Sequence, residues 1–103
     1  MTLLTKDLLR RLPPLYATED VGAPDKVAQA KFFTPWTGWT WFVLEYHPDE
    51  RLLFTLVVGL ETEFGYASLD ELEAIRGPGG LRIERDLHFK ATRLKDIPGL
   101  TLP

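Results

Sequence analysis

The feature that most constrains the fold of this chain is an aromatic segment, residues 32–46, with a turn in its middle. Residues 39–46 are almost all aromatic, β-branched or otherwise apolar, a composition typical of strands. Before them, Pro35 fixes φ and Gly38 tolerates positive φ, so a turn is predicted. We therefore expect residues 26–33 and 39–46 to pair as an antiparallel hairpin.

Two more strands are expected further along the chain. Residues 52–60 are apolar on both faces, which predicts a central strand that is covered twice. Residues 81–89 alternate between apolar and polar side chains and predict a final strand. The short connection around Pro48 favours antiparallel pairing of residues 52–60 with the hairpin.

Two helix starts carry N-cap signals. Thr5 precedes a leucine-rich segment that stops at Pro13. Ser68 forms a capping box with Glu71, and the helix is expected over residues 68–76. We therefore expect a small α+β fold, with a mostly antiparallel sheet of about four to five strands, one packed helix and a short N-terminal helix at an edge.

Length and composition are those of one ordinary domain. The chain has 103 residues, 45% hydrophobic and 26% charged, which suffices for one core. We expect residues 1–103 to form a single domain, with the proline-containing residues 90–103 as an extended tail. The absence of cysteine excludes disulfides, thiolate nucleophiles and thiolate zinc sites. With no secretion signal and no stretch of roughly 20 apolar residues, a soluble, cytoplasmic protein without membrane contact is expected.

The net charge of −3 is unevenly distributed. Residues 45–73 are rich in carboxylates, with Arg51 as their single base. Such a segment would repel a phosphate backbone and favours a basic protein as the partner. Its acids are Glu45, Asp49, Glu50, Glu61, Glu63, Asp70, Glu71 and Glu73.

Several short motifs are spread over nearly the whole chain. They are LLT (residues 3–5), LPPLY (12–16), KFFTP (31–35), GWTW (38–41), LVVGLETEFGY (56–66) and IERD (83–86). In the order and spacing of these motifs the chain resembles a bacterial family known as domain of unknown function 2958. Members of that family are often associated with plasmids and other mobile elements, so the resemblance implies a mobile-element context. The resemblance assigns no catalytic residue to this chain.

The aromatic side chains of the hairpin allow two interpretations. A sheet that presents rings beside a cation stacks single-stranded nucleic-acid bases, each worth about 1–3 kcal/mol. Alternatively the rings form the core, since aromatics bury large areas and pair well across strands. We expect most of them in the core and Trp36, which lies in the turn, as the ring most exposed to a partner. The candidate binding residues of this segment are Lys31, Trp36, Trp39 and Trp41.

Alternation along residues 39–46 predicts which side chains share a face of the strand. The expected sets are Trp39, Trp41 and Val43 on one face, and Thr40, Phe42, Leu44 and Tyr46 on the other. Both faces are rich in large apolar side chains, so one or two rings could remain exposed as a contact surface.

Two charged features are further candidates for a binding site. Glu61 and Glu63 lie two residues apart, and such a pair can bind a divalent cation or divide acid and base roles. Without a third ligand, an ion pair or a solvated strand end is the simpler interpretation. Arg85 interrupts the apolar alternation of the last strand, and an inward charge must be paired unless a β-bulge turns it outward. Its expected partners are Glu61, Glu63 and Glu45. Alternatively, Arg85 recognises an anion, with Asp86 beside it.

No metal ion and no cofactor are expected. Nothing in the spacing of His47 and His88 brings them together. The chain contains neither a nucleophile elbow nor an HExxH motif, so an enzyme is not favoured.

Three functions therefore stay open. The leading one is a small non-enzymatic binding or accessory protein that contacts a macromolecular partner, most simply a protein, through the aromatic hairpin and the acidic segment. The second is single-stranded nucleic-acid binding through exposed rings and the bases Lys31, Arg82, Arg85 and Lys90. The third is an enzyme or metal-binding protein that uses Glu61, Glu63, Arg85 and Asp86.

Overall fold

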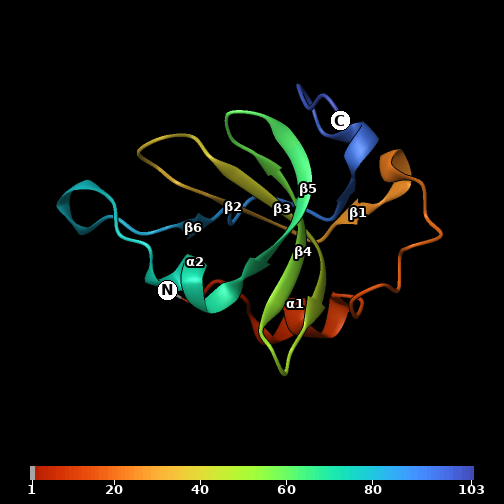
Figure 1. Ribbon diagram of the computed structural model, residues 1–103, viewed down its shortest axis with the longest axis horizontal. Coiled ribbons are helices and arrows are strands. Elements are labelled where there is room, and N and C mark those ends of the chain that lie inside the picture. The colour runs from red at the N-terminus through yellow and green to blue at the C-terminus, as the bar shows by residue number, and fades with distance from the viewer. Residues whose placement is uncertain (1) are drawn as a thin grey trace.

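An antiparallel sheet of five strands lies at the centre of the protein, seen in a computed structural model that describes residues 2–103 (Figure 1). The strand order is β5–β4–β3–β2–β6. These strands are β2 Ala30–Phe33, β3 Thr40–His47, β4 Leu52–Val58, β5 Thr62–Ser68 and β6 Glu84–Arg85. A separate pair joins β1 Val27–Ala28 to β7 Thr92–Arg93. The expected α+β fold with a mostly antiparallel sheet is confirmed.

Two α-helices, α1 Lys6–Arg11 and α2 Leu69–Ala74, begin where the sequence predicts them. The hydroxyls of Thr5 and Ser68 accept hydrogen bonds from backbone N–H groups of the first turns, at 3.1 Å and 3.3 Å. Helix α2 ends earlier than expected, because the chain is already extended at Ile75. In the described part of the chain, no helix is long and apolar enough to span a bilayer. Three short 3₁₀ turns complete the structure: η1 Ala23–Asp25, η2 Pro78–Gly80 and η3 Leu94–Asp96.

Both faces of the sheet are covered. On one, which we call the helix face, the two α-helices and the N-terminal leucines bury side chains that include Leu3, Leu8, Phe32, Trp41, Val43, Leu53, Leu69 and Leu72. On the other, the tail face, the C-terminal segment helps to bury Ala28, Phe42, Leu44, Leu56 and Leu94. The N-terminal helix is therefore part of a core and not an edge element. Residues 90–103, expected as an extended tail, instead contain β7 and η3 and pack on the sheet.

A β-bulge in β3 changes which side chains share a face. The register with β4 shifts between Val43 and Glu45. Tyr46 consequently lies on the helix face with Trp41, and not on the tail face with Phe42 as alternation predicts. One extra residue in a strand reverses the alternation beyond it, so the face predicted for Tyr46 is wrong.

Two expected strands differ in extent from those in the structure. Residues 26–33 form two strands, β1 and β2, in place of one. Of residues 81–89, only Glu84–Arg85 pairs with β2. The strand ends at Arg85, because the carboxylate of the next residue, Asp86, accepts a hydrogen bond from His88 N at 2.9 Å and holds a turn.

Strand β5 has no counterpart among the expected strands. The strand expected over residues 52–60 ends at Val58. A tight turn follows, in which Gly59 N donates a hydrogen bond to Glu61 O at 3.0 Å, and the chain then runs back alongside β4. Acids and Gly65 weaken the strand signal of this segment. Pairing with β4 decides its conformation instead.

A buried carboxylate joins the loop after α1 to the sheet. Glu45 is 3% exposed and accepts hydrogen bonds from Tyr16 N at 2.8 Å, from Thr18 N at 3.0 Å and from the Thr18 hydroxyl. In this loop Tyr16 has a φ of 71°, which non-glycine residues rarely adopt. The three donors offset the cost of removing the carboxylate from water, and the carboxylate in turn fixes the loop.

We predict that Glu45→Ala lowers the free energy of unfolding by about 1–3 kcal/mol, because the loop N–H groups lose their acceptor. Urea denaturation followed by tryptophan fluorescence measures the change. The control is Asp49→Ala, which removes an acid from the exposed β3–β4 turn and should cost less than about 0.5 kcal/mol. Equal losses in both variants would show that Glu45 has no special role.

Candidate functional site

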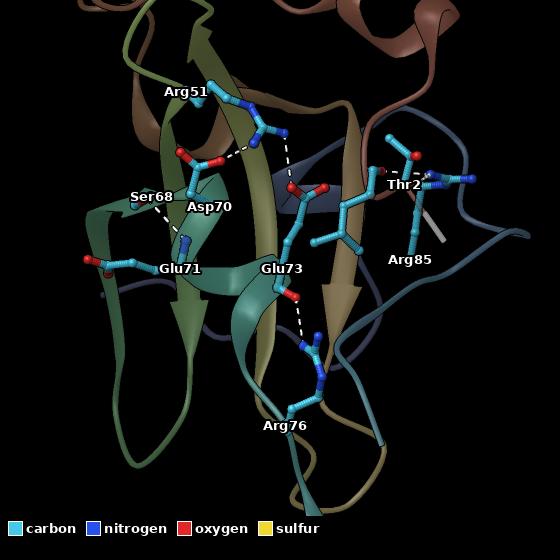
Figure 2. A network of polar contacts seen from close by, with 9 residues as sticks. Thr2, Arg51, Ser68, Asp70, Glu71, Glu73, Arg76 and Arg85 are labelled. Atoms are coloured by element: carbon cyan, nitrogen blue, oxygen red, sulfur yellow. Dashed lines mark hydrogen bonds and ion pairs between the residues drawn. The ribbon is translucent and has the colours of Figure 1, made fainter. Parts of the chain in front are cut away.

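Arg85 forms hydrogen bonds with the backbone of the N-terminal segment, and not with an acidic side chain. Its Nη1 donates hydrogen bonds to the carbonyl oxygens of Thr2 at 2.8 Å and Leu3 at 2.7 Å (Figure 2). Pairing with Phe32 places Arg85 on the helix face, where Leu3 is buried. The expected salt bridge is wrong, because the carbonyl groups satisfy the guanidinium instead. Within residues 2–103, no ion pair joins Arg85 to its expected partners Glu45, Glu61 and Glu63.

A cleft of about 510 Å³ lies beside Arg85, on the tail side of β2, and we call it the Lys31 cleft. Lys31 Nζ lies 3.8 Å from a carboxylate oxygen of Asp86. The structure thus brings three predicted site residues, Lys31, Arg85 and Asp86, to one cleft. Glu84 also lines it, so its acids and bases are equal in number and offer no positive field for an anion.

The three tryptophans differ in exposure. Trp41 is 8% exposed and belongs to the core of the helix face. Trp36 is half-buried, and its ring lies so close to Gly77 that a Cβ at Gly77 would be 2.4 Å from it. Trp39 is 39% exposed. The prediction that Trp36 is the most exposed ring is therefore wrong, because the turn folds back against the loop after α2.

The acidic segment does not form one continuous surface. Arg51 forms ion pairs with Asp70 and with Glu73, the latter at 3.0 Å (Figure 2). Hydrogen bonding to Glu73 raises the pKa of the Arg51 guanidinium. Glu45 is buried, as described above. Within residues 45–73, the exposed acids that form no ion pair with the described part of the chain are Asp49 and Glu50 in the β3–β4 turn, Glu61 and Glu63 at the opposite end of β4, and Glu71 on α2.

An exposed site with both apolar and acidic groups lies at the β4–β5 turn. Leu60, in the turn itself, is 94% exposed. The ring of Trp39 rests on the backbone of Gly59, where a Cβ would be 2.7 Å from it, and its centroid lies 6.2 Å from that of Trp41. We call this site, of about 330 Å³, the Trp39 hollow; its lining residues are Trp39, Val57, Leu60, Glu61 and Glu63.

Strand β5 forms an exposed edge of the sheet beside this hollow. It pairs with β4 along its whole length without a register shift, and no strand of residues 2–103 pairs with its other side. Alternation of the bulky Thr62, Phe64 and Tyr66 with other residues is the signal that could have revealed this strand in the sequence.

The residues that an enzyme or metal site would need are not brought together. Glu61 and Glu63 line the Trp39 hollow, whereas Arg85 and Asp86 line the Lys31 cleft. Among residues 2–103, no group of three or more histidine or carboxylate side chains is placed to hold a metal ion. His88 lines the Lys31 cleft, while His47 lies at the end of β3.

We predict different costs for an added methyl group at the two glycines that support tryptophans. Gly77→Ala should lower the free energy of unfolding by about 1–3 kcal/mol, because Trp36 must leave its place against the core. Gly59→Ala should cost less, since the more exposed Trp39 can move outward. Urea denaturation of both variants measures the difference. A larger loss for Gly59→Ala would contradict the assigned roles of the two rings.

Comparison with known proteins identifies a family. No curated protein and no solved structure matches the chain. A protein-family model described as "Protein of unknown function (DUF2958)" matches residues 3–95, a range that contains every motif on which the resemblance rests. The protein therefore belongs to the DUF2958 family.

Proposed function

We propose that the protein is a non-enzymatic binding protein that holds a basic segment of a protein partner against the Trp39 hollow. The observation that carries the proposal is an exposed apolar surface combined with two carboxylates, Glu61 and Glu63, which have no counter-ion within residues 2–103. Apolar surface grouped with polar groups in this way is characteristic of contact sites.

The hollow has the groups that recognise lysine and arginine. A tryptophan face attracts a cation through its ring quadrupole, and Trp39 offers such a face beside the acids. The apolar stem of a basic side chain can pack on Leu60, whose own side chain is almost fully in solvent. Carboxylates at the rim also attract a basic partner before contact.

The family resemblance supports a setting for this role. Because relatives are often associated with mobile elements, we place the binding function in mobile-element biology and in the cytoplasm. Proteins that handle nucleic acid are commonly basic, since they neutralise phosphates, and they carry segments of the required charge. Such a protein, of the host or of the element, is the partner that fits the hollow.

Single-stranded nucleic-acid binding has less support. Lys31 and the half-buried Phe33 line the Lys31 cleft, as a base-stacking site would require. Glu84 and Asp86 line the same cleft, however, and Arg85 is engaged by backbone carbonyls. A phosphate backbone would therefore meet carboxylates.

We predict that a double variant, Glu61→Gln with Glu63→Gln, retains about a tenth or less of the partner captured from a bacterial lysate by the intact protein, and that the captured partner is basic. Quantitative mass spectrometry of immobilised intact and variant proteins measures the difference. The control, Asp49→Asn with Glu50→Gln, removes the same charge at the opposite end of β4 and should capture as much as the intact protein.

Two outcomes would count against the proposal. One is equal capture by the two double variants. The other is tryptophan quenching by a single-stranded oligonucleotide at low salt that persists in Glu61→Gln with Glu63→Gln, which would favour nucleic-acid binding.

A further inference from the structure

The outer edge of β5 is the least protected part of the sheet. Its seven residues, Thr62–Ser68, present backbone N–H and C=O groups at alternate positions on the side away from β4. Neither a bulge nor a proline nor a lysine interrupts this edge. The opposite edge has the usual protection, because β6 is only two residues long. An extended segment of another chain could add to β5 through main-chain hydrogen bonds.

The two faces of β5 present different chemistry to a strand added beside it. Pairing places Glu63 opposite Val57, on the face that contains the Trp39 hollow. Phe64 lies opposite Leu56 and therefore on the tail face, which it shares with Tyr66. Side chains of an added strand would lie alternately beside a carboxylate and beside aromatic rings.

Both faces leave room for such side chains. On the acidic face, no atom lies within 4 Å of the position that a Cβ at Gly65 would take. The aliphatic stem of a lysine or arginine beside Glu63 can lie across this bare backbone. On the aromatic face, Tyr66 is 54% exposed and packs against Phe54 with ring centroids 5.2 Å apart. An apolar side chain of the added strand would cover the exposed part of Tyr66.

We infer that the partner segment binds as an extended strand along the outer edge of β5, with basic side chains on the Glu63 face and apolar side chains on the Phe64 and Tyr66 face. This inference rests on the proposed function and adds the binding mode and the alternating pattern of the partner. Backbone pairing supplies affinity, and the two unlike faces of β5 select the register.

A second copy of this chain is the competing occupant of the edge. Two antiparallel β5 strands would extend the sheet across both copies. They would also gather Glu61 and Glu63 of both copies on one face, in a chain whose net charge is already −3. A basic segment relieves this repulsion, whereas a second copy increases it.

The test uses the full chain, labelled with ¹⁵N, and capped synthetic peptides as long as β5. In the first peptide lysine and valine alternate; in the second the same residues form a lysine block and a valine block; in the third glutamate replaces lysine. Titration at low salt, where surface charges are weakly screened, is followed by amide chemical shifts and hydrogen exchange. The alternating lysine peptide should bind at least about tenfold more tightly than the other two and protect alternate amides of residues 62–68.

A charge reversal tests the assignment of the faces. Glu63→Lys lies on an exposed strand position and should leave the fold intact, as circular dichroism can verify. It should weaken the lysine peptide by about tenfold and strengthen the glutamate peptide. The control, Glu50→Lys in the exposed β3–β4 turn, makes the same change of charge away from Glu63 and should alter neither affinity.

The outcomes separate this inference from the proposed function. Equal binding of the alternating and block lysine peptides, with shifts confined to the Trp39 hollow, would overturn strand addition while the proposed function stands. Amide protection of β5 that depends on protein concentration and needs no peptide would identify a second copy as the occupant and overturn the inference. If no lysine peptide binds at low salt, both are overturned.

Discussion

Strand β3 has apolar side chains on both of its faces, and the rest of the structure depends on this. A strand of that kind is stable only if two layers cover it, since each exposed large apolar side chain forgoes roughly 1.5–3 kcal/mol. The chain meets the requirement with α1, α2 and the N-terminal leucines on the helix face, and with the C-terminal segment on the tail face. The N-terminal segment thus contributes to one core and the C-terminal segment to the other.

These covering layers are short or irregular, so polar contacts at their ends hold them in place. The α-helices have six residues each, too few to be stable alone. Arg85 fastens the segment before α1 through two carbonyl groups, and Glu45 fastens the loop after it. Arg51 links the β3–β4 turn to α2 through Asp70 and Glu73. Arg85, which the sequence offers as a candidate site residue, therefore serves to attach the cover.

The sequence predicts those parts of the fold that local patterns decide. Both N-caps, the central strands and the fold class follow from residue type and periodicity. The bulge before Glu45 could not be predicted, because it depends on pairing with β4 and leaves no mark on local composition. The hydrogen-bond partners of Arg85 could not be predicted either, because they are backbone carbonyls more than 80 residues earlier in the chain. The position of Trp39 beside Glu61 and Glu63 was not predicted, because the turn between β4 and β5 that brings them together could not be recognised from local composition.

Trp39 is exposed, yet its side chain is held in a fixed orientation, unlike that of a mobile surface residue. Both Trp36 and Trp39 rest on glycine backbones, but Trp36 closes the helix-face core, whereas Trp39 lies beyond the end of the cover. Contact with Gly59 and with the ring of Trp41 fixes the orientation of Trp39 before any partner arrives. A side chain that is already ordered loses little conformational entropy on binding. Ordering a flexible side chain at an interface would cost about 0.5–1.5 kcal/mol, and this cost is avoided here. Because the edge of β5 is ordered by the same sheet, the apolar ring, the carboxylates and the open backbone groups form one preorganised surface.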